Sequence, residues 1–100
     1  MFPIKNYKKD IALLCKKHKV KHLYVFGSAL TEKFNEKSDI DLIVDFEDVD
    51  LINYADNYFD LKFSLQNMFH RTIDLLEEKA IRNPYFKKVV NDQRQLVYGY

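Results

Sequence analysis

The sequence has little of what marks several classes of protein. One cysteine in 100 residues excludes an internal disulfide, so we expect a reducing, cytoplasmic setting. Two glycines and two prolines exclude a linker or a low-complexity chain. No apolar run approaches the roughly 18 residues of a membrane helix, and the N-terminus lacks the apolar stretch of a signal peptide. The sequence therefore predicts a single domain spanning residues 1–100, with no membrane partner.

The charges are nearly balanced, with 16 basic and 15 acidic residues. A dedicated nucleic-acid binder usually carries a basic excess, so nucleic acid is not the expected partner. Aromatic residues are abundant around one predicted strand and the helix after it: Phe46, Tyr54, Tyr58, Phe59, Phe63 and Phe69. We expect most of these rings in the core, and the surplus fits a surface that meets another protein.

Hydrophobic periodicity predicts alternating helices and strands. Helices are expected at 4–18, 53–69 and 84–92, with one or two helical turns at 29–34. Strands are expected at 22–26, 39–46 and 72–76, and the segment 95–98 is a short strand or a helical end. This order predicts an α/β (α+β) domain in which helices flank a small sheet. Periodicity alone leaves both a parallel and a mixed sheet open.

Three carboxylates lie in predicted strands that are otherwise apolar. Asp39 and Asp41 are two residues apart and therefore point to the same face of their strand, and Asp74 lies between Ile73 and Leu75. Burying a carboxylate in an apolar strand costs free energy of folding unless the group is solvated, paired or bound to a metal. A solvated strand face is the simpler alternative, above all for Asp74. Oxygen ligands favour Mg²⁺ or Mn²⁺ over zinc, so a divalent cation is the functional interpretation.

The first predicted strand ends at Gly27-Ser28. Glycine permits close approach of a ligand to the backbone, and exposed amides with a serine hydroxyl suit phosphate oxygens. Ser28 is also a plausible cap for the helical turns that follow, a role compatible with phosphate binding. A phosphate turn combined with metal-binding carboxylates indicates phosphoryl or nucleotidyl transfer.

The combination of these motifs resembles the DNA polymerase β-like nucleotidyltransferases. The matching residues are Phe26-Gly27-Ser28, then ten residues, then Asp39-Ile40-Asp41-Leu42. The segment from Ser38 to Leu42, the isolated Asp74 and the closing segments 83–86 and 96–98 are similar to minimal nucleotidyltransferases, the MntA-type antitoxins. Each motif is weak alone, whereas the set at this spacing is specific and spans nearly the whole chain.

The resemblance implies a mixed β-sheet with flanking helices and a two-Mg²⁺ site. Asp39 and Asp41 would hold the ions, while Asp74 would complete the site and help to deprotonate an attacking hydroxyl. Gly27 and Ser28 would hold the β and γ phosphates of the substrate ATP, and Ser38 is also assigned to the nucleotide. The implied partner is a HEPN-domain toxin that receives AMP on a tyrosine. Both a homo-oligomer of this chain and a hetero-oligomer stay open.

The sequence departs from the family pattern at one place. Many members continue Gly-Ser-x-x-Arg-Gly, whereas this chain has Thr31 and Glu32 in place of Arg-Gly. The change removes a positive charge near the triphosphate and weakens the expectation of tight ATP binding. It leaves open a second interpretation, an antitoxin that is weak or inactive as an enzyme and neutralises its toxin by contact. A third, transfer to a small molecule, is disfavoured because related enzymes hold such acceptors with an additional domain.

Overall fold

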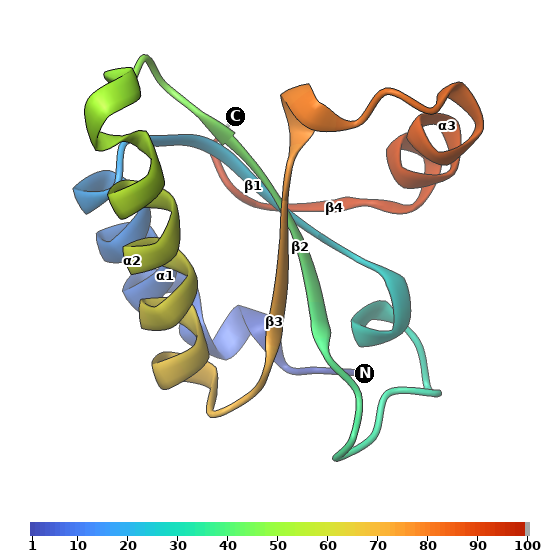
Figure 1. The fold of residues 1–100 in the computed structure, drawn as a ribbon. Helices are drawn as coiled ribbons and strands as arrows, with labels where there is room; N and C mark the ends of the chain where they lie inside the picture. The colour runs from blue at the N-terminus through green and yellow to red at the C-terminus, as the bar shows by residue number, and fades with distance from the viewer. Residues whose placement is uncertain (100) are drawn as a thin grey trace.

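The fold is a four-stranded sheet with helices on both faces (Figure 1). The computed structural model describes residues 1–99. The helices and strands are α1 (Lys8–Lys17), β1 (Val20–Phe26), β2 (Ile40–Phe46), α2 (Leu51–Phe69), β3 (Ile73–Glu77), α3 (Pro84–Gln93) and β4 (Gln95–Tyr98). Three 3-10 turns complete the order: η1 (Ile4–Tyr7), η2 (Gly27–Leu30) and η3 (Glu78–Ala80). Within residues 1–99, no helix combines the length and apolar character needed to cross a bilayer.

The sheet is mixed, as the resemblance implied. Its strand order is β3-β2-β1-β4. Strand β1 runs antiparallel to both β2 and β4, whereas β2 and β3 are parallel and are joined by α2. A parallel pair requires a long crossover, and the helix predicted between the two strands supplies it. The α/β prediction with helices flanking a small sheet is therefore confirmed.

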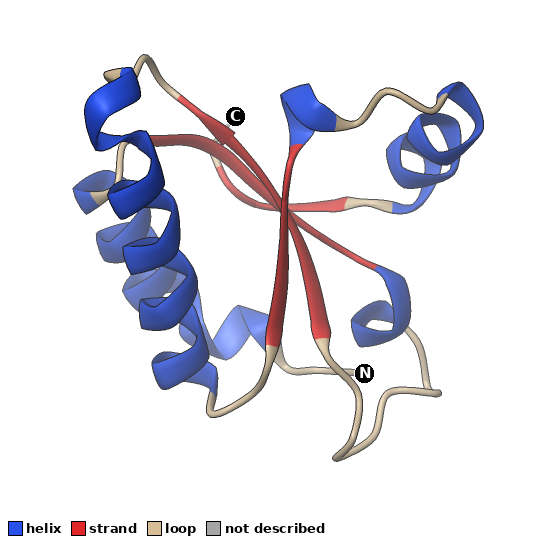
Figure 2. Ribbon diagram, viewed as in Figure 1, coloured by secondary structure: helices blue, strands red, loops and turns tan. Residues whose placement is uncertain are grey.

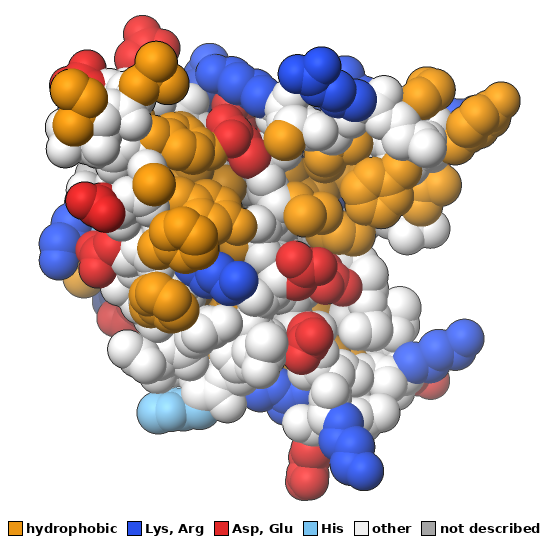
Figure 3. All heavy atoms as spheres, viewed as in Figure 1, with side chains coloured by type: hydrophobic (Ala, Val, Ile, Leu, Met, Phe, Trp, Pro, Cys, Tyr) orange, Lys and Arg blue, Asp and Glu red, His pale blue; other side chains and the backbone are white. Residues whose placement is uncertain are grey.

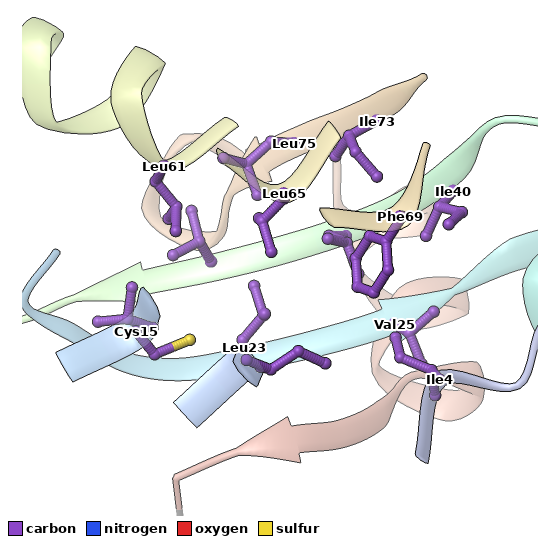
Figure 4. Packing of buried hydrophobic residues seen from close by; sticks show 14 of the residues in the cluster. Ile4, Cys15, Leu23, Val25, Ile40, Leu61, Leu65, Phe69, Ile73 and Leu75 are labelled. Carbon is purple, nitrogen blue, oxygen red and sulfur yellow. The ribbon is translucent and has the colours of Figure 1, made fainter. Parts of the chain in front are cut away.

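The main core lies between one face of the sheet and the helices α1 and α2 (Figure 4). Alternate residues of the strands point into it, as the alternating pattern of β2 predicts. Its buried members include Leu23, Val25, Ile40, Leu42, Val44, Ile73 and Leu75 from the strands, and Ile11, Cys15, Leu61, Leu65 and Phe69 from the helices. Burial raises the pKa of the Cys15 thiol to about 12, so this cysteine is inert at neutral pH.

The opposite face of the sheet is covered in part by α3, which Figure 2 shows apart from the other long helices. Val90 of α3 and Ile43 of β2 are buried outside the main core. The ring of Phe86 meets that of Phe26 edge to face at 6.3 Å, and the guanidinium of Arg94 lies 3.9 Å from the ring centre of Tyr24. These contacts anchor α3 to β1 and leave a second, smaller apolar layer on this face.

Some predicted boundaries were wrong. The helix expected at 4–18 is divided into η1 and α1, because Tyr7 leaves helical geometry between them. Strand β1 begins at Val20 rather than residue 22, because Lys19 adopts a left-handed conformation that stops α1 and lets Val20 pair with Phe46. The turns expected at 29–34 occur instead at Gly27–Leu30. The segment 95–98 is a strand, so the helical alternative is wrong.

Helix α3 begins at a cap that can be tested directly. The Asn83 side-chain oxygen accepts hydrogen bonds from the backbone N–H groups of Tyr85 (3.0 Å) and Phe86 (3.2 Å). We expect Asn83→Ala to lower the free energy of unfolding by about 1 kcal/mol, because two amides lose their acceptor. Urea denaturation checks this, with Asn83→Asp as the control that keeps a capping oxygen. An unchanged midpoint for Asn83→Ala would contradict it.

Candidate functional site

The sequence-predicted residues gather at one end of the sheet. Phe26 at the end of β1 is paired with Asp41 near the start of β2, and Asp41 is paired with Asp74 near the start of β3. Gly27 follows Phe26 directly, so the turn and two of the carboxylates lie side by side on three neighbouring strands. Neighbouring residues in register point to the same face of a sheet. This face is the one opposite the main core.

The absence of a side chain at Gly27 is what admits the Asp41 carboxylate. Gly27 has a φ of +76°, a left-handed conformation that residues with a side chain rarely adopt. A Cβ atom built there would lie 2.6 Å from Oδ2 of Asp41. The turn and the carboxylate are therefore in direct contact, which explains physically why a glycine stands at this position.

The three carboxylates influence one another. The pKa of Asp41 is raised, first by burial and then by the negative charges of Asp74 and Asp39. Asp41 is half-buried, whereas Asp39 and Asp74 are exposed. Figure 3 shows acidic side chains in the middle of one face, between hydrophobic surfaces over α2 and over α3. A concentration of negative charge beside a strained turn is the main electrostatic feature of this end of the sheet.

Asp39 and Ser38 lie in the loop between η2 and β2. The prediction that Asp39 lies in the same strand as Asp41 was wrong, because β2 begins at Ile40 and Asp39 immediately precedes it; its charge nevertheless reaches Asp41. The Ser38 hydroxyl oxygen accepts a hydrogen bond from the backbone N–H of Asn35 at 3.1 Å. This hydrogen bond lies within the loop. The assignment of Ser38 to nucleotide binding stays a prediction.

Comparison with known proteins identifies the family. Residues 8–100 match the family "Polymerase beta, Nucleotidyltransferase". The chain belongs to this family. Two curated relatives from Methanocaldococcus jannaschii are named "Putative protein adenylyltransferase", MJ0128 and MJ1379. MJ0128 is 36% identical over 91% of this chain and 88% of its own length; MJ1379 is 33% identical over the same shares.

Solved structures share the fold of this nucleotidyltransferase. A structure described as a "putative minimal nucleotidyltransferase" superimposes with a TM-score of 0.76 and 24% identity, covering 92% of this chain and 90% of that one. A toxin–antitoxin structure with AMP-PNP gives a TM-score of 0.71 and 23% identity, covering 93% and 73%. The MntA-HepT toxin–antitoxin structure gives 0.65 and 21%, covering 96% and 73%. The predictions of a nucleotidyltransferase and of its minimal, MntA-like fold are confirmed.

The place where the nucleotidyltransferase departs from its family pattern has a clear local structure. The Thr31 backbone N–H and hydroxyl both donate to the carbonyl oxygen of Ser28, at 2.9 and 3.0 Å. Thr31 therefore closes the turn that begins at Gly27, and Glu32 beside it is exposed. Thr31 thus has a structural role in the turn, and Glu32 places a negative charge next to it.

The carboxylates fit Mg²⁺ by their chemistry. The pKa of Asp41 is raised first by burial and then by the charges of Asp74 and Asp39, and a divalent cation bound by these hard oxygen donors would relieve that repulsion. In the described chain, 1–99, no group of three or more His, Cys, Asp or Glu side chains is placed to hold an ion by itself. Mg²⁺ is commonly held by one or two carboxylates with substrate phosphates supplying further ligands. The carboxylates of this site therefore suit an ion shared between protein and substrate phosphates better than an ion held by protein ligands alone.

Two residues near the carboxylates escaped the sequence reasoning. The Tyr58 hydroxyl of α2 donates to the carbonyl oxygen of Leu75 in β3, and its pKa is raised by burial, by Asp74 and by Glu77. The Arg71 side chain contacts the loop that precedes Asp39. The spacing of Tyr54 and Tyr58, one helical turn apart, was a usable signal for the first. Nothing in the local pattern points to Arg71.

Proposed function

We propose that this chain is a Mg²⁺-dependent nucleotidyltransferase that moves AMP from ATP to a hydroxyl of a partner protein, as the antitoxin of a HEPN toxin–antitoxin pair. The observation that carries the proposal is the placement of Asp41 between the Gly27 turn and Asp74. A glycine turn and two carboxylates thus lie side by side on one face of the sheet, in a chain that belongs to the nucleotidyltransferases.

Each residue has a distinct role in the proposal. Gly27 and Ser28 bind the β and γ phosphates through the turn, with Ser38 assigned to the same nucleotide. Asp39 and Asp41 would hold two Mg²⁺ ions, with Asp74 as a further ligand. When bound, Mg²⁺ would neutralise charge on the phosphates and lower the pKa of the attacking hydroxyl.

The chemical step is a displacement at the α-phosphorus of ATP. The acceptor hydroxyl oxygen forms a bond to this phosphorus, and the bond to the oxygen bridging to the β-phosphate breaks. Pyrophosphate leaves with that oxygen and its electron pair. Asp74 is exposed and is suited to accept the hydroxyl proton, which then passes to solvent. The products are the adenylylated partner and pyrophosphate.

The surface around the carboxylates supports a protein as the acceptor. Phe59 and Phe63 of α2 are 50% and 54% exposed, and Tyr85 and Val89 of α3 are 84% and 50% exposed. These two hydrophobic areas flank the acidic centre in Figure 3. Aromatic residues are enriched where proteins meet. The relatives named as protein adenylyltransferases and the toxin–antitoxin neighbours are consistent with this acceptor.

The reaction belongs in the cytoplasm, where ATP and Mg²⁺ are available and the single thiol stays reduced. Incubation with ATP, Mg²⁺ and the HEPN-domain protein encoded beside this chain tests the proposal. Intact-mass spectrometry of the partner is expected to show the addition of AMP with the wild-type chain. Addition should be lost with Asp41→Asn or with EDTA. An unmodified partner, or equal modification with Asp41→Asn, would contradict the proposal.

A second function is favoured by the exposed Glu32 beside the turn, which adds negative charge next to Thr31, the position of the arginine in the family pattern. In this second function, the chain neutralises its toxin by binding to it, without transferring AMP. The double variant Asp39→Asn, Asp41→Asn distinguishes the two. Full inhibition of the toxin by this variant without ATP would support binding alone, whereas strict loss of inhibition would support transfer.

A further inference from the structure

Arg71 lies in the short connection between α2 and β3 and reaches across to a different part of the chain. Its guanidinium Nη2 donates to the backbone carbonyl oxygens of Asn35 and of Ser38, the latter at 2.6 Å. The same guanidinium lies 4.4 Å from the ring centre of Phe34. One half-buried side chain thus contacts three residues of the loop between η2 and β2.

The backbone conformation before Arg71 places it for these contacts. His70 ends α2 in a left-handed conformation with φ of 54°, and the backbone N–H groups of both His70 and Arg71 donate to the carbonyl oxygen of Gln66. The chain therefore turns sharply away from the helix at Arg71. Three residues later it carries Asp74, the second residue of β3, so the arginine and this carboxylate lie close together in the chain.

The contacts of this segment fall on both sides of Asp39. Arg71 holds the carbonyl oxygen of Ser38, which precedes Asp39, and the Thr72 carbonyl oxygen accepts from the N–H of Ile40, which follows it, at 3.0 Å. Asp39 is thus fixed by hydrogen bonds to adjacent residues of the connection that leads to Asp74. Apart from these bonds, the loop from 31 to 39 is held by hydrogen bonds within itself and by Phe34, whose ring meets that of Phe2 at 5.6 Å.

We propose that Arg71 is a positioning residue, which holds Asp39 where it binds a divalent cation together with Asp41 and Asp74. The inference rests on the proposed function and adds to it a residue that does not touch the substrate. Arginine suits the position because a planar guanidinium donates to two carbonyls while it stacks on an aromatic ring. Lysine keeps the positive charge but lacks the planar guanidinium group and its fixed arrangement of N–H donors.

Binding of Mn²⁺ in the presence of AMP-PNP tests the proposal without requiring turnover. Electron paramagnetic resonance of free Mn²⁺ gives the affinity of the wild type, Arg71→Gln and Arg71→Lys. Loss of a residue that orients a metal ligand typically weakens metal binding about 10- to 100-fold. We expect a loss of that order for Arg71→Gln and a smaller, several-fold loss for Arg71→Lys.

Arg94→Gln is the matched control. Arg94 also pairs with other groups, an ion pair with Glu78 and a contact over the Tyr24 ring, but neither partner is in the loop before Asp39. We expect it to lower the melting temperature while leaving Mn²⁺ affinity near that of the wild type. If Arg71→Gln does not fold, as judged by circular dichroism, Arg71→Lys decides the outcome.

Equal Mn²⁺ affinity for the wild type and the folded Arg71 variants would overturn this inference and leave the proposed function standing. Failure of the wild type itself to bind Mn²⁺ with AMP-PNP would overturn the proposed function, and this inference with it. A selective loss in the Arg71 variants supports the positioning role, because a purely structural contribution would lower stability without a change in metal affinity.

Discussion

Asp41→Asn is expected to abolish AMP transfer and at the same time to raise the melting temperature of the metal-free protein. Asp41 is the half-buried member of the acidic group, and its neighbours Asp74 and Asp39 both raise its pKa after burial has done so. In the proposed reaction, removing its charge removes a metal ligand that acts in the transition state. We expect a loss of at least about a thousandfold in rate, or roughly 4 kcal/mol. A coupled assay of pyrophosphate release measures it.

The stability gain has a defined pH dependence. A pKa raised in the folded state means that the folded protein favours the protonated form, so this contribution to stability is complete below the unfolded pKa and is lost as pH rises through the folded pKa. The ordinary pKa of an aspartate carboxyl group is 3.8. The variant and the wild type should therefore melt alike well below that pH and diverge above it. Thermal unfolding in EDTA should show a gain of roughly a few degrees at neutral pH.

Asp45→Asn is the control for this prediction. Asp45 lies on the same strand, but its carboxylate contacts the His22 Nδ1 at 3.2 Å. We expect no gain in melting temperature from Asp45→Asn. Added Mg²⁺ with AMP-PNP should stabilise the wild type and not Asp41→Asn. A lower melting temperature for Asp41→Asn in EDTA would contradict the expectation that burial and like-charge repulsion together make the charged carboxylate unfavourable in the folded protein.

Gly27→Ala is expected to cost both stability and activity. The left-handed conformation disfavours alanine by about 1–2 kcal/mol, and the added Cβ would lie 2.6 Å from Oδ2 of Asp41. The end of a side chain can move away at little cost, so the backbone strain dominates the loss of stability. The displaced atom is nevertheless a metal-binding oxygen in the proposed reaction. We expect a rate loss of about 100-fold or more.

A matched control exists at the other glycine. Gly99 also has a positive φ, of +98°, and a Cβ there would lie 2.3 Å from the backbone oxygen of Lys21, far along β1 from the turn. Gly99→Ala should therefore destabilise the fold at least as much as Gly27→Ala. Its activity at a temperature where both variants are folded should stay near that of the wild type. Equal activity losses in the two variants would mean that strain, and not the position of Asp41, explains the effect.

The candidate site shows which structural features the local sequence pattern predicts and which it does not. The alternation within β2 predicts correctly that Asp41 faces away from the main core, since side chains alternate across a strand, whereas Asp39 lies just before the strand. Helix α2 was predicted well because its apolar residues repeat over many turns. The boundaries of the first helix and of β1 were missed because they depend on the conformations of Tyr7 and Lys19, single residues that carry no periodic signal.

Sequence by itself determined which groups this protein has for chemistry and how they are spaced: the Gly27-Ser28 turn, the Asp39 and Asp41 pair, and Asp74 between two apolar residues. These are properties of a few adjacent residues, set by side-chain type and by strand alternation. Only the tertiary structure decided that β2 and β3 run parallel with Asp41 opposite Asp74, that Gly27 touches Asp41, and that Arg71 holds the loop before Asp39. Such contacts join residues far apart in the chain, and their free energy comes from packing and strand pairing across the whole domain, which no local pattern records.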